Sequence, residues 1–193
     1  MTEYKKYYIS GLVSLTPGRV SDDRGYFSEI FRIDLFNQHV GEHKFIQSNE
    51  SLSTQAGTIR GLHFQSEPHV QGKLVRCTAG ALFDVAVDIR NGSPTYGQWV
   101  GETLTPDNGK QLWVPPGFAH GFCSLEPNTV ICYNVTDYYN ARCDKGLAWN
   151  DPAIAIRWPD IANTDTLSLK DLNLPPLSDL PAYFSWPNSI ESE

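Results

Sequence analysis

The stretch from Gly57 to Cys77 holds the residue types that acid–base chemistry needs. His63 lies in a strand-like run with Arg60 three residues before it, and Lys73 and Arg76 follow in a second strand-like run. An imidazole can move a proton near neutral pH, and a nearby ammonium can stabilise the negative charge that remains. This stretch therefore predicts acid–base work on an anionic substrate. The alternative is that His63 completes a core and that the cations are solvated strand residues.

A second histidine follows a rigid turn. The Pro-Pro-Gly sequence at 115–117 fixes the backbone before His120, so that its imidazole arrives in a defined direction. This run matches PxGxxH, the second signature of the cupin barrel. The first cupin signature would place two histidines as HxH, whereas the run from His63 to Gln65 reads HFQ. Since catalytic zinc sites use three protein ligands, we predict a barrel without a bound metal.

The chain around these residues reads as short strands. From Leu82 to Arg90 the residues alternate, with Phe83 and Val85 on one face and Asp84 on the other. Asn-Gly pairs at 91–92 and 108–109 are turn signals between such runs. Many short strands at close spacing predict an all-β, antiparallel sandwich or barrel. Further strands are expected at Tyr7 to Val20, Tyr26 to Phe31 (with Phe27, Glu29 and Phe31 on one face), Phe45 to Ser51, Trp99 to Leu104, Gln111 to Val114, Gly121 to Leu125 and Val130 to Val135, and short peripheral helices at Arg32 to Val40 and near Ser168 to Leu172.

Composition limits the class of protein. The 193 residues suit a single domain, with a proline-rich tail from about residue 172. A formal charge of −7 argues against nucleic acid and acidic membranes as partners. The four cysteines form no CxxC motif, and no stretch is apolar for long enough to span a bilayer. We therefore expect a cytoplasmic protein with free thiols.

From about Asp22 to Asp171 the chain contains, in order, the motifs DDRGYFSE, IRGLHFQ, QGKLVRC, FDVAVDIR, SPTYGQWVG, QLWVPPGFAHGF, TDYY, WNDP and IRWP. These motifs resemble those of the dTDP-4-dehydrorhamnose 3,5-epimerases. The resemblance implies a cupin-like jelly-roll barrel, a homodimer with an exchanged strand, and neither cofactor nor metal. It also implies a reaction that inverts C3 and C5 of a 4-keto-6-deoxyhexose attached to thymidine diphosphate.

The resemblance assigns roles that the reaction makes reasonable. Hydrogens at C3 and C5 flank the C4 ketone, so removal of either leaves an enolate that needs a base, an oxyanion site and an acid on the opposite face. By resemblance His63 is the base, Tyr138 is the acid and Lys73 stabilises the enolate. Asp171 matches the carboxylate that holds the tautomer of His63. Asp84 is the alternative partner of His63, or else it pairs with His120.

The nucleotide needs cations for its phosphates and flat surfaces for its base. By resemblance Arg24 and Arg60 bind the phosphates, and Phe27 and Glu29 contact thymine, either in their own subunit or across a dimer. The remaining substrate-binding candidates are Gln47, Asn49 and His120.

The spacing of Arg60 and His63 raises a geometric question. Residues three apart on a regular strand point to opposite faces of a sheet. We predict that a bulge at Gly61 turns both side chains toward one site. Without a bulge, Arg60 is the assignment that would be given up first.

Three other functions compete with the double inversion. A mono-epimerase would invert C3 or C5 alone, and a 3,4-ketoisomerase of a related dTDP-sugar would move hydrogen between C3 and C4. A sugar-nucleotide-binding barrel would bind without reaction. Because both His63 and Tyr138 are present, the sequence favours inversion at both carbons.

Overall fold

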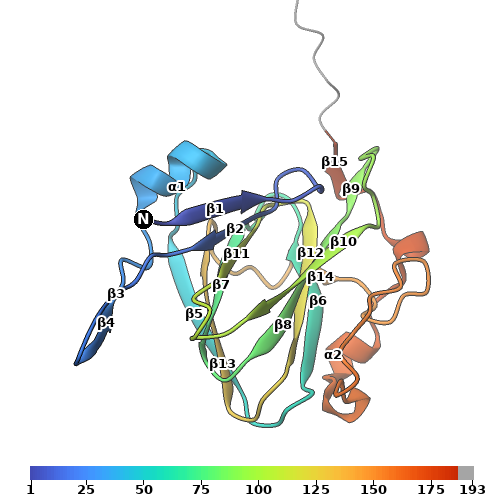
Figure 1. The fold of residues 1–193 in the computed structure, drawn as a ribbon. Coiled ribbons are helices and arrows are strands. Elements are labelled where there is room, and N and C mark those ends of the chain that lie inside the picture. The colour runs from blue at the N-terminus through green and yellow to red at the C-terminus, as the bar shows by residue number, and fades with distance from the viewer. Residues whose placement is uncertain (187–193) are drawn as a thin grey trace, which may run out of the picture.

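The computed structural model describes residues 1–186 and forms a jelly-roll barrel from two antiparallel sheets (Figure 1). The predicted all-β, antiparallel jelly roll with short peripheral helices is thereby confirmed. One sheet has the strand order β1-β2-β11-β7-β13-β5 and the other β10-β8-β12-β6-β14. Their strands are β1 (Glu3–Lys6), β2 (Val13–Thr16), β5 (Gln47–Ser53), β6 (Ile59–Gln65), β7 (Lys73–Ala79), β8 (Leu82–Asp88), β10 (Trp99–Leu104), β11 (Gln111–Val114), β12 (Phe118–Ser124), β13 (Thr129–Val135) and β14 (Asp144–Gly146).

The five-stranded sheet is covered on both faces, which explains why its strands contain few exposed residues. Leu82 and Ala86 of β8 pack inside the barrel, whereas Val85 and Val87 pack on the outer face against the chain that follows Trp149. The predicted alternation along β8 is therefore confirmed, but both of its faces are buried. Each fully buried Leu, Ile or Val side chain contributes about 1.5–3 kcal/mol relative to exposure.

The N-terminal strands differ from the prediction. The expected strand from Tyr26 to Phe31 ends at Phe27, because β3 (Val20–Asp22) and β4 (Gly25–Phe27) pair as a hairpin that projects from the barrel (Figure 1). Beyond Phe27 the chain returns to the barrel, where Phe31 packs with the core residue Phe36. Phe27 is 73% exposed, so it does not share a face with Phe31.

Both predicted helices are present at the edges of the barrel. Helix α1 (Ile33–Val40) buries Phe36 against the six-stranded sheet and ends at Gly41, whose φ of 128° suits a glycine. Helix α2 (Leu169–Leu172) begins after Ser168, whose hydroxyl accepts the backbone N–H of Asp171. Two 3₁₀ turns, η1 (Thr164–Thr166) and η2 (Leu177–Asp179), lie nearby. Among residues 1–186, no helix has the length and apolar character needed to cross a membrane.

Candidate active site

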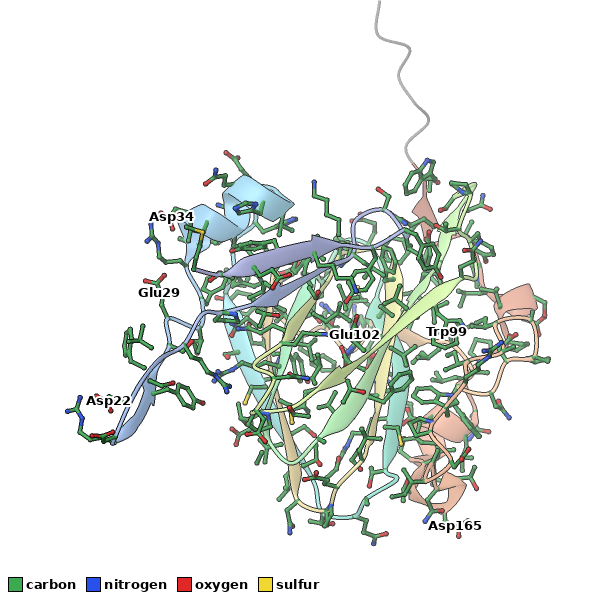
Figure 2. The ribbon with its side chains drawn as sticks, viewed as in Figure 1. Asp22, Glu29, Asp34, Trp99, Glu102 and Asp165 are labelled. Atoms are coloured by element: carbon green, nitrogen blue, oxygen red, sulfur yellow. The ribbon has the colours of Figure 1, made fainter. Side chains whose placement is uncertain are left out.

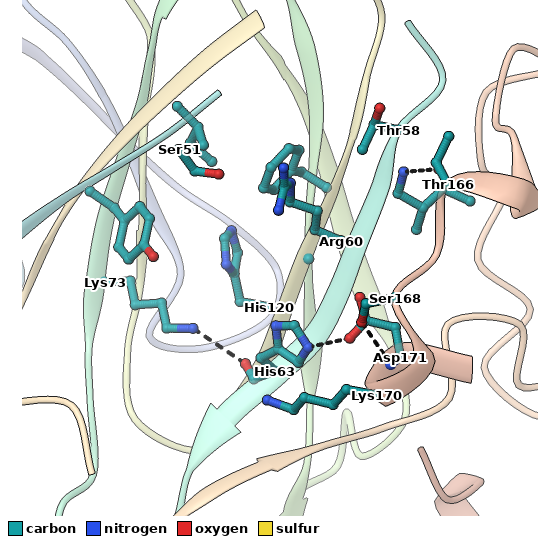
Figure 3. A pocket seen from close by; sticks show the side chains of 15 residues that line it. Ser51, Thr58, Arg60, His63, Lys73, His120, Thr166, Ser168, Lys170 and Asp171 are labelled. Carbon is teal, nitrogen blue, oxygen red and sulfur yellow. Dashed lines mark hydrogen bonds and ion pairs between the residues drawn. The ribbon is translucent and has the colours of Figure 1, made fainter. Parts of the chain in front are cut away.

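A cavity of about 320 Å³ opens between the two sheets beside helix α2 (Figure 3). It brings together His63, Arg60, Lys73, His120 and Asp171, five of the residues singled out from the sequence. They come from β6, β7, β12 and α2, and so from segments far apart in the chain. The other lining residues are Ser51, Thr58, Ile59, Gly121, Phe122, Ile131, Tyr133, Thr166, Ser168 and Lys170.

A bulge in β6 lets Arg60 and His63 face the same cavity. His63 pairs with His120 of β12 and Arg60 pairs with Phe122, so two residues of β6 lie opposite the single residue Gly121. The predicted bulge at Gly61 is therefore confirmed, and Arg60 keeps its place beside the cavity. Gly61 has a φ of 121°, and a Cβ built there would lie 2.6 Å from the Cα of Gly121.

Substitution of Gly61 by alanine is expected to destabilise the fold by about 3–4 kcal/mol, since it combines an unfavourable backbone conformation with a backbone clash. Gly92 provides the matched control, because its φ is also positive, at 82°, but a Cβ there would meet nothing within 4 Å. Gly92→Ala should cost about 1 kcal/mol. Denaturant unfolding of both variants measures the difference, and equal losses would contradict the role of close packing at Gly61.

His63 and Asp171 form a short hydrogen-bonded pair at the cavity. The His63 Nε2 to Asp171 Oδ1 distance is 2.6 Å, and Asp171 is only 4% exposed. Burial acts to raise the pKa of Asp171, but the hydrogen bond and charge of His63, together with hydrogen bonds from Gly61 and Ser168, lower that pKa below its ordinary value. The ionised carboxylate therefore accepts the Nε2 proton, which leaves Nδ1 as the basic nitrogen of the imidazole.

The two alternatives for Asp84 are separated by the geometry. Asp84 Oδ1 lies 2.8 Å from His120 Nε2, whereas His63 bonds to Asp171. Asp84 is fully buried, and its Oδ2 has no hydrogen-bond partner within the described part of the chain. His120 thus lines the cavity while its imidazole is hydrogen-bonded to a second buried carboxylate, that of Asp84.

Lys73 places a desolvated ammonium next to His63. Its Nζ donates to the backbone carbonyl of His63 at 3.4 Å. Burial lowers the pKa of Lys73 to about 8, although Asp144 and Asp84 oppose this effect. A cation with little surrounding water interacts strongly with an oxyanion.

The structure does not bring Tyr138 to the cavity. Its side chain is 62% exposed, while another tyrosine, Tyr133 on β13, lines the wall with His63 and Lys73. Burial raises the pKa of Tyr133, so its phenol keeps its proton. Sequence reasoning missed Tyr133, although it shares the inward face of β13 with Ile131 by the period of two.

A smaller cavity of about 190 Å³ adjoins the first, because both are lined by His63, Lys73, Tyr133 and Lys170. Gln47 and Asn49 lie in its wall, and Gln47 Nε2 donates to Asn49 Oδ1 at 2.7 Å.

Three further residues that line this smaller cavity, Tyr139, Asp144 and Lys170, were assigned no role from the sequence. Asp144 Oδ2 accepts Lys170 Nζ at 2.6 Å and the hydroxyl of Tyr139 at 3.1 Å. For Lys170 the sequence did offer a signal, because it directly precedes Asp171 in α2 and so had to lie close to the site.

Arg24, Phe27 and Glu29 do not reach this pocket within one subunit. They lie on or next to the projecting β3–β4 hairpin, on the side of the molecule where Figure 2 labels Asp22 and Glu29. Arg24 is exposed and pairs locally with Asp22.

Among residues 1–186, no three His, Cys, Asp or Glu side chains are placed to hold a metal ion.

A family profile, relatives in sequence and solved structures all point to the same protein family. Residues 6–179 match the profile of the dTDP-4-dehydrorhamnose 3,5-epimerases. A Sinorhizobium fredii protein of that name is 55% identical over 95% of this chain and 93% of its own length. The Bacillus anthracis enzyme, solved with TDP and PPi bound, is 44% identical with a TM-score of 0.87 and covers 91% of this chain and 99% of its own. The Legionella pneumophila enzyme, solved with dTDP-4-keto-L-rhamnose, is 39% identical and has a TM-score of 0.91. The match covers 97% of this chain and 100% of that enzyme's chain.

Proposed function

Since this chain belongs to the dTDP-4-dehydrorhamnose 3,5-epimerase family, we propose that it inverts C3 and C5 of dTDP-4-dehydro-6-deoxy-D-glucose to give dTDP-4-dehydro-L-rhamnose. One observation supports this most directly. A histidine paired with a buried carboxylate, a protonated tyrosine and a desolvated lysine line one cavity. These are the base, the acid and the oxyanion site that inversion beside a ketone requires.

In the proposed reaction His63 removes the hydrogen next to the C4 ketone. The C–H electrons move into the carbonyl, which becomes an enolate oxygen, and the proton goes to the free nitrogen of His63. Asp171 stabilises the imidazolium that forms and keeps the ring oriented. The Lys73 ammonium stabilises the enolate oxygen as a compact positive charge.

Tyr133 then donates its phenolic proton to the same carbon from the opposite face, which inverts the centre. We propose Tyr133 for this role in place of Tyr138, because Tyr133 lines the cavity with His63 and Lys73. The imidazolium of His63 then loses its extra proton to water, and the Tyr133 phenolate takes a proton from water, which restores both groups. The cycle then repeats at the other carbon next to the ketone.

Binding of the thymidine diphosphate draws on both cavities. Arg60 offers a guanidinium at the larger cavity, while Gln47, Asn49 and Tyr139 supply polar and flat surfaces at the smaller one. Arg24, Phe27 and Glu29 complete the nucleotide site of a partner subunit in this proposal. His120 contacts the sugar from the cavity floor.

In this proposal the chain forms a homodimer with an exchanged strand, which would explain why the β3–β4 hairpin exposes apolar side chains. Val20 and Phe27 are each 73% exposed on it, and Arg24 lies in solvent at its tip. A second copy would cover these apolar side chains and gain the cation. The mass of the protein in solution tests this: twice the chain mass supports the dimer, and the chain mass contradicts it.

The pH dependence of kcat should reflect the protonation state of Lys73. A lysine acts as a cation only while protonated, so kcat is expected to fall as the pH rises through about 8, the lowered pKa of this group. Lys73→Arg should lose some rate at every pH but lack this alkaline fall, since arginine stays charged. Turnover of both proteins from pH 6 to 10 checks the assignment, and an unchanged alkaline limb in Lys73→Arg would assign it to another group.

Incubation with dTDP-4-keto-6-deoxyglucose in deuterated water tests the function. Deuterium at both C3 and C5, with inverted stereochemistry in the NMR spectrum, supports the proposal. Label at one carbon identifies a mono-epimerase, and a ketone moved to C3 identifies a ketoisomerase. Binding without label identifies a sugar-nucleotide-binding barrel.

We further propose a cytoplasmic location. Cys77, Cys123, Cys132 and Cys143 are all free thiols in the fold. Burial raises the pKa values of Cys77 and Cys123 to about 11, so both thiols stay protonated.

A further inference from the structure

The chain continues past the profile match that ends at residue 179 and packs on the barrel as a strap. We define residues 180–186 as the C-terminal strap. Its strand β15 (Phe184–Ser185) pairs in parallel with β9 (Arg90–Asn91), so that Phe184 lies opposite Arg90. Leu180, Tyr183 and Phe184 pack on the outer face of the five-stranded sheet. The inner face of the same sheet carries His63 and His120.

One contact of the strap is with Phe64, the residue next to His63 in β6. The ring of Phe64 lies 5.4 Å from that of Tyr183 and 5.7 Å from that of Phe184, edge to face in both pairs. Phe64 is buried by this packing. Neighbouring residues of a strand point to opposite faces of the sheet. A sideways or rotational shift of Phe64 would therefore move the imidazole of His63.

The second contact is with Phe118, two residues before His120 in β12. The Arg90 guanidinium lies 4.4 Å from the ring centre of Phe118 and 4.3 Å from that of Trp186. The Arg90 guanidinium also donates two hydrogen bonds, of 2.8 and 2.7 Å, to the buried carboxylate of Asp88. Trp186 donates its backbone N–H to Asn91, which anchors the end of the strap.

From these contacts we propose that the C-terminal strap is a positioning element for the two histidines of the active site. Tyr183 and Phe184 hold β6 at Phe64, and Trp186 holds the start of β12 through Arg90. No residue of the strap lines either of the two cavities, so in this proposal it acts on the rate through geometry. Small displacements of a catalytic group lower the chemical rate far more than they lower ligand affinity. The proposal builds on the proposed epimerase function.

The test uses the full chain with Tyr183→Ala and Trp186→Ala, and with Tyr183→Phe and Trp186→Phe as conservative partners. We expect kcat to fall about tenfold in the alanine variants, with dTDP affinity within about twofold of the wild type. The phenylalanine variants should recover most of the rate, because they keep the ring contacts. Ile33→Ala removes an exposed apolar side chain from helix α1, which packs on the other sheet, and should leave the rate unchanged.

Amide hydrogen exchange supplies a readout that does not depend on activity. In Tyr183→Ala the amides of β6 should exchange faster than in the wild type, and in Trp186→Ala the amides at the start of β12 should do so, while those of β5 should not change in either variant. Wild-type kcat together with wild-type protection of β6 and β12 would overturn the proposal. Parallel losses of kcat and dTDP affinity, or faster exchange throughout the barrel, would also overturn it by showing a general loosening. If the wild type shows no epimerisation, the proposed function is wrong. Hydrogen exchange in the variants would still test whether the strap holds β6 and β12 in place.

Discussion

His63→Ala is expected to lower deuterium exchange at both C3 and C5 by about 10³–10⁴-fold, because one base serves both carbons in the proposed cycle. The affinity for dTDP should stay within a few-fold of the wild type, since in the proposed complex arginines bind the phosphates and the smaller cavity binds the thymine. The two measurements are NMR detection of deuterium incorporation and calorimetric titration with dTDP.

The matched control for this substitution is His39→Ala. That imidazole is on helix α1, stacked on Tyr4 with 4.2 Å between ring centres, and it lies outside the cavity. His39→Ala should keep wild-type exchange. Persistent exchange at either carbon in His63→Ala would remove His63 as the common base.

Tyr133→Phe is expected to lower the formation of inverted product by about 10²–10³-fold. The phenylalanine keeps the ring packing and removes the proton that the opposite face receives. Because His63 can still remove a hydrogen and return solvent deuterium to the same face, exchange with retained stereochemistry should fall less than inversion. Comparing the label content with the stereochemistry of the recovered sugar separates these two outcomes.

Tyr138→Phe is the control that decides between the two tyrosines. Tyr138 is mostly exposed and lines neither cavity, so this variant should invert the substrate at nearly the wild-type rate. A large loss in Tyr138→Phe with normal inversion in Tyr133→Phe would restore Tyr138 as the acid.

Much of the fold could be predicted because local signals suffice for it. Alternation fixes the faces of β8, and the apolar spacing with Gly41 fixes helix α1. The bulge at Gly61 followed from the three-residue spacing of Arg60 and His63, since one cavity can receive both only if the strand is irregular. The boundary at Phe27 was missed because alternation continues into residues that leave the hairpin.

The site required long-range information that local patterns lack. His63 and Asp171 are 108 residues apart, and their pairing depends on how α2 packs beside β6. The TDYY motif drew attention to Tyr138, whereas orientation within β13 places Tyr133 in the cavity. The roles of Arg24, Phe27 and Glu29 would require a second subunit, and they stay predictions.

The most direct test of the whole account is a crystal structure with dTDP-L-rhamnose, whose sugar lacks the ketone and cannot react. The account predicts that the hexose ring lies between the His63 imidazole and the Tyr133 phenol, with the C4 oxygen within hydrogen-bonding distance of Lys73 Nζ. A hexose ring outside the space between these two side chains, or one packed against Tyr138, would contradict it.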